Sequence, residues 1–308
     1  MKDKKIIVLM GGPSAEAEVS RRTGAAVLAA LQEKGYRAEG LELDPPRLIS
    51  QLQEKKCDIV FNAVHGKFGE DGALQGLLDM IGMRYTGSGL LASAVTMDKV
   101  ASKRVFEAVG IATPRSRSYH RDDRRRDLAA EIAAEFSVPV VIKAASQGSS
   151  IGVVIVEDTA EIAAALATAF EYSEAVLVEE FIKGRELTVA VWATEPKEAL
   201  PVIEIIPHSG RYDYESKYTK GAADHIVPAK LSPALTEQLQ ELAIQTFTAA
   251  GCNGVARIDM MLSEADKPYV LEVNSVPGMT ETSLVPDAAR AKGISFPDLC
   301  EKILLMVR

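Results

Sequence analysis

Cysteine is scarce in this sequence and forms no pattern that could hold a metal or a disulfide framework. The three cysteines, Cys57, Cys252 and Cys300, are far apart and odd in number. Metal-binding cysteines usually come in close pairs, and small disulfide-rich proteins carry even sets. Because free thiols persist in reducing compartments, this pattern predicts a cytoplasmic protein.

Long apolar runs and an excess of positive charge are also missing. A membrane-spanning helix needs about 20 consecutive apolar residues, and no such run is present. The basic start at residues 1–5 is followed by an apolar run that ends at Gly11, too short for a signal peptide. With 43 acidic and 35 basic residues, the formal net charge is −8. Nucleic-acid binding favours a broad basic face, so we expect neither nucleic acid nor membrane as a partner.

The order of the predicted elements indicates an α/β protein, and 308 residues favour two or three domains. In the first third, apolar periodicity predicts strands at residues 5–10, 36–43 and 58–64. Helices are expected between them and after them, at residues 15–34, 46–54 and 73–81. This β-α-β-α-β order predicts a parallel sheet with helices on both faces. A further helix is expected at residues 98–109.

The middle of the chain repeats this alternation on a smaller scale. Strands are expected at residues 138–143, 152–156 and 175–180, with a helix at 159–170. The last part begins with long strands at 186–193 and 199–206. A helix at 233–250, a strand pair at 254–260 and 269–274, and two short helices complete it. Residues 207–228 are polar and aromatic without clear periodicity, which predicts a functional loop over a site.

The clearest chemical signal is a set of polar residues in the last quarter of the chain. Glu272 and Asn274 are two apart on one predicted strand and therefore share a face, as do Arg257 and Asp259 on its neighbour. Their apolar flanks predict partial burial, and buried charges need partners. Carboxylate and amide oxygens suit Mg²⁺, and an adjacent arginine suits a reacting group with negative charge. The alternative interpretation is a solvated strand pair with surface charge.

Two loops after predicted parallel strands carry candidate substrate contacts. Glu16 stands at a helix start, where its carboxylate opposes phosphate and favours an ammonium group, such as that of an amino acid. His65 follows the third strand, and ligands of open parallel sheets gather at the carboxyl ends of strands. Ordinary helix-terminal charge for Glu16 and a structural role for His65 stay open as alternatives.

The middle of the chain offers features of a nucleotide site between two sheets. Lys143 ends a strand and can hold phosphate, while the Gly/Ser loop at residues 147–150 can bring backbone N–H groups to the same phosphates. The link after Glu179 can give adenine backbone hydrogen bonds, although exposed charge is the alternative there. In the loop without periodicity, Lys217 could bind an anion and Tyr218 could cap a small substrate; the alternative is a mobile surface loop.

In their order and spacing, these motifs resemble the D-alanine–D-alanine ligase family of the ATP-grasp superfamily. The matching stretches lie at residues 11–20, 65–72, 97–99, 143–152, 212–218, 257–259, 272–280 and 283–286. The resemblance implies an N-terminal Rossmann-like parallel-sheet domain at 1–97 and a two-lobed ATP-grasp fold. The lobes would be a central subdomain at 98–182 and a catalytic domain at 183–308. The chain departs from the family at Ala144, where Pro is usual, and at Ser275, where Thr is common.

The resemblance also implies roles for single residues. ATP would be bound by Lys99, Lys143, Ser149, Ser150, Glu179, Phe181, Ile182 and Glu186, with the two lysines on its phosphates. Two Mg²⁺ ions, replaceable by Mn²⁺, would be coordinated by Asp259, Glu272 and Asn274. Glu16, linked to Ser149 and Tyr218, would anchor the ammonium group of the first D-alanine, with His65 near its carboxylate. The oxyanion would be stabilised by Arg257 and Gly278, and the second D-alanine's carboxylate would be fixed by Lys217, Ser283 and Leu284.

The implied reaction joins two D-alanines through an acyl phosphate, with ATP becoming ADP, for peptidoglycan precursor synthesis. A homodimer is expected. Two alternatives remain at this point. A related ligase could use D-lactate or D-serine as the acceptor. A nucleotide-binding regulator without turnover is the other, and the intact metal set together with Arg257 argues against it.

Overall fold

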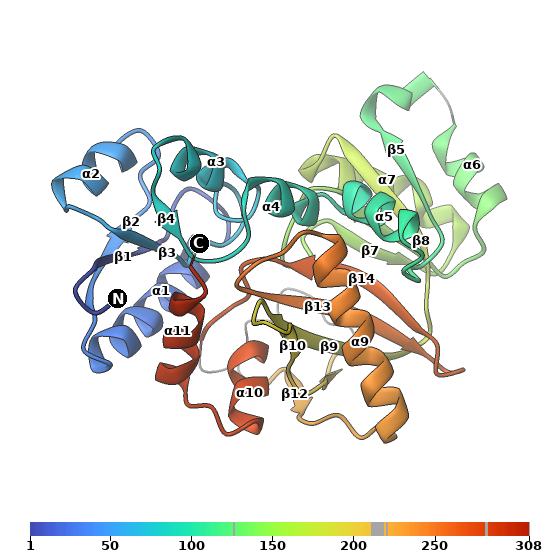
Figure 1. The fold of residues 1–308 in the computed structure, drawn as a ribbon. Coiled ribbons are helices and arrows are strands. Elements are labelled where there is room, and N and C mark those ends of the chain that lie inside the picture. The colour runs from blue at the N-terminus through green and yellow to red at the C-terminus, as the bar shows by residue number, and fades with distance from the viewer. Residues whose placement is uncertain (126, 211–218, 220, 281–282, 308) are drawn as a thin grey trace.

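The computed structural model describes residues 1–125, 127–210, 219, 221–280 and 283–307. Their strands form three sheets, each built from one stretch of the chain (Figure 1). The predicted segments 1–97, 98–182 and 183–308 each contain one of these sheets. The domain boundaries themselves stay a prediction. Within the described ranges, none of the helices combines the length and the apolar character needed to cross a membrane.

The first sheet is parallel, as the alternation of strands and helices predicts. Its strands are β1 (Lys5–Met10), β2 (Arg37–Glu42), β3 (Ile59–Asn62) and β4 (Arg84–Tyr85), in the order β2-β1-β3-β4. The helices of this region are α1 (Ala17–Glu33), α2 (Leu48–Glu54), α3 (Ala73–Met80) and α4 (Leu90–Met97). On β1, Ile6 and Val8 join one core cluster, and Ile7 and Leu9 join another. Both faces of the strand are therefore covered, which is typical of parallel sheets.

The strand order places two loops of this sheet side by side. The chain leaves β1 toward β2 on one side, while β3 lies on the other side of β1. Such a reversal opens a crevice at the carboxyl ends of the two central strands. The segment with Glu16 follows β1 and the segment with His65 follows β3, so the fold brings these two side chains to the same edge.

The second sheet is antiparallel, so the alternation in the middle of the sequence does not produce parallel pairing. Its strand order is β5-β8-β6-β7, formed by β5 (Ser116–His120), β6 (Val140–Ala144), β7 (Val153–Val156) and β8 (Ala175–Glu180). The accompanying helices are α5 (Lys99–Ala108), α6 (Leu128–Glu135) and α7 (Ile162–Tyr172), with 3-10 turns η1 (Arg121–Arg125) and η2 (Thr159–Glu161). The sequence did not predict β5 or α6. The polar composition of β5 hides its single buried side chain, Tyr119.

The third sheet is also antiparallel and carries the predicted Asp259/Glu272 strand pair. Its strands are β9 (Gly184–Trp192), β10 (Glu198–Ala199), β11 (Ile203–Pro207), β12 (Ala223–Ile226), β13 (Val255–Ser263) and β14 (Pro268–Asn274). They run in the order β12-β11-β9-β13-β14, with β10 also on β9. Helices α9 (Pro233–Ala249), α10 (Leu284–Ala291) and α11 (Phe296–Leu305) belong to the same stretch of chain.

Two expectations for this region were wrong. Residues 199–206 do not form one strand but belong to β10 and β11, separated around Pro201, which has no N–H for a ladder. Residues 207–228 are not all loop, because β12 pairs there with β11. Residues 211–218 and 220 of that segment lie outside the described residues.

Close backbone contact fixes the first sheet against the third. Gly87, just after β4, approaches Gly254, just before β13, and Ser88 and Asn253 exchange hydrogen bonds beside them. A Cβ at Gly254 would lie 2.9 Å from the Cα of Gly87. Helix α11 lies against α1 at the same junction (Figure 1). The site residues of β13 are therefore held at a set position relative to those after β1 and β3.

Replacing Gly254 by alanine should reveal how much this junction contributes. Gly254 has φ +68°, so alanine would incur about 1–2 kcal/mol of left-handed strain, plus about 1–3 kcal/mol for the clash with Gly87. Gly251 is the matched control, since its φ is +70° but its nearest neighbour, Ala92, is 3.9 Å from the added Cβ. Denaturant unfolding should show a larger loss for Gly254→Ala than for Gly251→Ala. Equal losses would mean that the close approach contributes nothing.

Candidate active site

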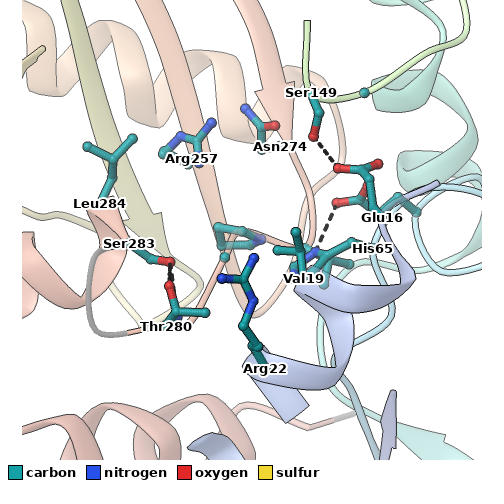
Figure 2. Close-up of a pocket in the computed structure, with 15 residues that line it drawn as sticks. Glu16, Val19, Arg22, His65, Ser149, Arg257, Asn274, Thr280, Ser283 and Leu284 are labelled. Carbon is teal, nitrogen blue, oxygen red and sulfur yellow. Dashed lines mark hydrogen bonds and ion pairs between the residues drawn. The ribbon is translucent and has the colours of Figure 1, made fainter. Parts of the chain in front are cut away.

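A pocket lies where the loops after β1 and β3 meet the β13–β14 pair and the Gly148–Ser149 loop (Figure 2). It is lined by residues far apart in the sequence. The predicted site residues that it brings together are Glu16, His65, Ser149, Arg257, Asn274, Gly278, Ser283 and Leu284. The pocket therefore joins the first sheet, the loop of the second sheet and the third sheet at one place.

The Glu16 carboxylate is fixed in the pocket wall. Glu16 occupies the N-cap position of α1 and is 7% exposed. Its carboxylate accepts a hydrogen bond from the Ser149 hydroxyl (Figure 2). A Cβ at Gly66 or Gly148 would lie 2.6 or 2.9 Å from its Oε2, so the carboxylate packs closely against the backbone on both sides. Ser149 and Ser150 have φ of +51° and +59°. Such strain in non-glycine residues clusters at functional sites.

A second carboxylate, that of the partly buried Glu70, lies behind His65. The His65 Nδ1 is 3.9 Å from Glu70 Oε1, and its Nε2 is 3.0 Å from the Thr23 hydroxyl. Burial raises the pKa of Glu70, and the negative charge of Glu16 adds to this effect, while a hydrogen bond with His65 opposes it. This end of the pocket is rich in carboxylates and favours an ammonium group.

Asp259 accepts hydrogen bonds from three other side chains of the third sheet. Its two oxygens accept hydrogen bonds from Arg257 Nε and Nη2, both at 2.8 Å. The Thr188 hydroxyl donates at 2.6 Å and the Asn274 amide at 2.9 Å. Glu272 faces Asp259 across the β13–β14 pair, with a bulge just beyond. Alternation on the two strands thus places the four predicted polar residues together.

The carboxylates present here limit what ion the site can take. In the described part of the chain, no three His, Cys, Asp or Glu side chains cluster as a metal site. Asp259 and Glu272 supply two carboxylates, and Asn274 an amide oxygen. That set fits Mg²⁺, which keeps waters and phosphate oxygens in its shell. Because each Asp259 oxygen already accepts two protein hydrogen bonds, an ion bound there would displace one of the donors, Arg257, Thr188 or Asn274.

The predicted phosphate lysines lie next to these carboxylates. Lys99 is the first residue of α5, whose N-cap Asp98 accepts a hydrogen bond from Ala101 N. Its ammonium group is 2.5 Å from Gln147 O and 3.5 Å from Glu272 Oε2. It therefore joins the Gly/Ser loop to the strand pair.

Glu179 is buried between two lysines. Its Oε2 is 2.5 Å from Lys143 Nζ, and its Oε1 is 2.8 Å from Lys103 Nζ. Burial alone would raise the pKa of Glu179, but the two ammonium groups hold it below its usual value. Burial would lower the pKa of Lys143, yet the charges of Glu179, Glu272 and Glu186 raise it. These five charged groups form one electrostatic unit.

The remaining predicted contacts lie around this unit and at the far end of the pocket. Phe181 is 37% exposed just after β8, and Ile182 follows it. At the pocket's far end, Ser283 begins α10, and its hydroxyl accepts a hydrogen bond from Thr280 N at 3.0 Å. Gly278 lies beside it, because a Cβ there would be 2.9 Å from Ser283 Oγ. Lys217 and Tyr218, which were also predicted, lie outside the described residues.

Comparison with known proteins identifies the family of this chain. A family model described as "D-ala D-ala ligase C-terminus" matches residues 105–305, and one described as "D-ala D-ala ligase N-terminus" matches residues 39–88. The D-alanine–D-alanine ligase of Moorella thermoacetica is 46% identical, covering 97% of this chain and 98% of that protein. The chain belongs to the D-alanine–D-alanine ligase family. It is a ligase with an ATP-grasp fold.

Solved structures agree with this D-alanine–D-alanine ligase assignment. A Bacillus anthracis D-alanine–D-alanine ligase complexed with ATP superposes with a TM-score of 0.84 at 34% identity, covering 98% of this chain and 97% of that one. The VanG D-Ala:D-Ser ligase from Enterococcus faecalis also gives a TM-score of 0.84, at 29% identity, covering 98% and 99%. The fold predicted from the sequence is confirmed.

Sequence reasoning missed several residues of this candidate site. Val19, Arg22 and Glu70 line the pocket. Lys103, which is 3% exposed, forms an ion pair with Glu179. Glu70 lies in the stretch 65–72 that resembles the family, so its nearness to His65 could have been inferred. Arg22 and Lys103 gave no such signal, because a basic residue on a helix is usually solvated.

Removing the charge of Glu179 should destabilise this ligase strongly. Glu179→Gln leaves Lys143 and Lys103 buried without their carboxylate, and breaking a buried ion pair costs about 3–5 kcal/mol. Glu180→Gln is the matched control, because Glu180 ends the same strand, and its Oε1 accepts a hydrogen bond from Arg115 N near solvent. Denaturant unfolding at pH 7 should show a loss of less than about 1 kcal/mol for the control.

The difference should depend on pH in a defined direction. The folded-state pKa of Glu179 is lowered, so its stabilisation is present above the unfolded-state pKa of about 4.3. It is lost as pH falls below that value through the lower folded pKa. Wild type and Glu179→Gln should therefore converge in acid. A gap that stays constant from pH 7 to pH 3 would contradict the ion pairing.

Proposed function

We propose that this protein joins two D-alanines to D-alanyl-D-alanine while ATP is converted to ADP and phosphate, for peptidoglycan precursor synthesis. Membership of the ligase family over nearly the whole chain supports this. The observation that carries it is the pocket itself, where a fixed carboxylate, Glu16, and a guanidinium, Arg257, line one space beside the Gly/Ser loop. A zwitterionic amino acid needs such opposite charges.

Glu16 would bind the ammonium group of the first D-alanine. Ser149 and Tyr218 would complete the hydrogen-bond network around Glu16. His65 would lie near the first substrate's carboxylate. That carboxylate would attack the γ-phosphorus of ATP, giving an acyl phosphate and ADP. Fixed orientation of the two reactants supplies much of the catalysis in such reactions.

The second D-alanine would then attack the acyl carbonyl through its amine, and phosphate would leave. Arg257 and the Gly278 N–H would stabilise the oxyanion that forms. Ser283, Leu284 and Lys217 would fix the carboxylate of this acceptor. Burial of Leu284 gives the subsite an apolar side, which suits the small methyl group of alanine.

Lys99 and Lys143 would hold the ATP phosphates, helped by the loop with Ser149 and Ser150. Glu179, the backbone at Phe181 and Ile182, and Glu186 would bind adenosine. Asp259, Glu272 and Asn274 would hold two Mg²⁺ ions, which neutralise phosphate oxygens when bound. The closeness of Lys99 to Glu272 supports a shared phosphate-metal region.

We also propose a cytoplasmic homodimer. Met80 and Leu91, at the end of α3 and the start of α4, are 87% and 74% exposed. Such apolar exposure is typical of an interaction surface. Light scattering that gives twice the mass of one chain would agree, and a single-chain mass would reject the dimer.

The function is tested by measuring ADP release with a panel of D- and L-amino acids. Release should require D-alanine, and the product should be the dipeptide. Because a D-Ala:D-Ser ligase shares the fold, D-serine and D-lactate belong in the panel as competing acceptors. Preference for either over D-alanine would replace the dipeptide proposal, and ATP binding without amino-acid-dependent turnover would favour a regulator.

Glu272→Gln should lower turnover by at least about 100-fold, because even outer-shell changes at metal sites cost 10–100-fold. Glu264→Gln is the control. Glu264 pairs with Lys183 on the surface, so its loss should leave turnover unchanged. Unfolding curves should be similar for both variants. Near-normal activity of Glu272→Gln at saturating Mg²⁺ would reject the metal assignment.

A further inference from the structure

Two consecutive arginines of α1 have different surroundings. The Arg21 guanidinium bonds to Glu42 at 2.8 Å and lies 3.4 Å from Glu18, on the outer surface. Arg22 instead lines the pocket, and Figure 2 shows its guanidinium reaching from α1 toward the space between Val19 and Thr280. Among the described residues, Arg22 has no recorded acceptor. Successive helix positions point about 100° apart, which accounts for the difference.

Helix α1 therefore carries opposite charges along one wall of the pocket. Glu16 precedes the helix, Val19 follows one turn later, and Arg22 another turn later, and all three line the pocket. Six residues of helix span about 9 Å. Two amino acids joined head to tail span about 7 Å. The backbone positions of these two oppositely charged residues are thus separated by about the length of a dipeptide.

The opposite side of the pocket near Arg22 is polar. The Thr280 and Ser283 hydroxyls are 2.8 Å apart, and both residues line the pocket (Figure 2). Of the described lining residues, only Arg22 and Arg257 carry guanidinium groups. Arg257 makes a bidentate pair with Asp259. Arg22 is therefore the guanidinium of this pocket that no protein carboxylate engages in the described structure.

We propose that Arg22 binds the carboxylate of the acceptor amino acid and makes that carboxylate a requirement for acceptance; this rests on the proposed ligase function. A guanidinium pairs with a carboxylate through two parallel N–H···O bonds. The acceptor's amine is consumed in the reaction, while its carboxylate persists in the product. The positive charge of Arg22 also offsets the protein's net charge of −8, which otherwise disfavours binding of the acceptor's negatively charged carboxylate.

The test compares Arg22→Gln and Arg22→Lys with Arg21→Gln in the ADP-release assay, with initial rates that separate the two D-alanine KM values. Arg22 is exposed, so an ion pair worth about 1 kcal/mol corresponds to a roughly fivefold change. The acceptor KM should rise about fivefold or more in Arg22→Gln and less in Arg22→Lys. The ATP KM and the donor KM should stay constant. Arg21→Gln should match wild type in all three.

D-alaninamide, which lacks the carboxylate, provides a second readout that a structural role would not move. Wild type should prefer D-alanine over D-alaninamide as the acceptor, and Arg22→Gln should reduce this preference by the same factor of about five. An unchanged ratio, or an effect confined to the ATP KM, would overturn the inference. If wild type released no ADP in response to D-alanine, the proposed function itself would fail.

Discussion

The geometry of the site depends on the Asp259 carboxylate, which three neighbouring strands hold at once. Thr188 donates from β9, Arg257 from β13 and Asn274 from β14. A carboxylate that is 6% exposed would be costly to bury without such partners. The same bonds orient the Arg257 guanidinium, so the residue that would face a reacting carbonyl is positioned by the residue that would hold an ion. Binding at one of them must alter the other.

A second constraint is the pairing of the Glu179 carboxylate with the ammonium groups of Lys103 and Lys143. Without this carboxylate, Lys103 and Lys143 would repel each other in a region of low polarity. Because Glu186 and Glu272 also act on Lys143, the charges of the predicted nucleotide and metal residues balance as one set. Phosphate groups brought to Lys99 and Lys143 would add negative charge to this set. Bound metal cations would balance this added negative charge, which is consistent with a metal-dependent reaction.

Much of this fold could be predicted because local patterns agreed with the final structure. The buried run at β1 and the alternation on β14 follow directly from period-two geometry. Residues Asp259, Glu272 and Asn274 were placed together for the same reason. The antiparallel pairing of the second sheet could not be predicted in this way. Pairing depends on long-range contacts, and strands such as β5 bury too few side chains to leave a pattern.

The parts of the site that the sequence concealed are those made by distant segments. Arg22 looks like one of two solvated arginines on a helix, and only the approach of residues 276–280 and 283–284 turns its surroundings into a pocket wall. Ser149 and Ser150 give no sequence sign of their left-handed backbone, which tertiary contacts with Glu16 must support. The Gly87–Gly254 contact sets the distance between these segments. Packing between the sheets, rather than any single motif, therefore decides which charges meet in the pocket.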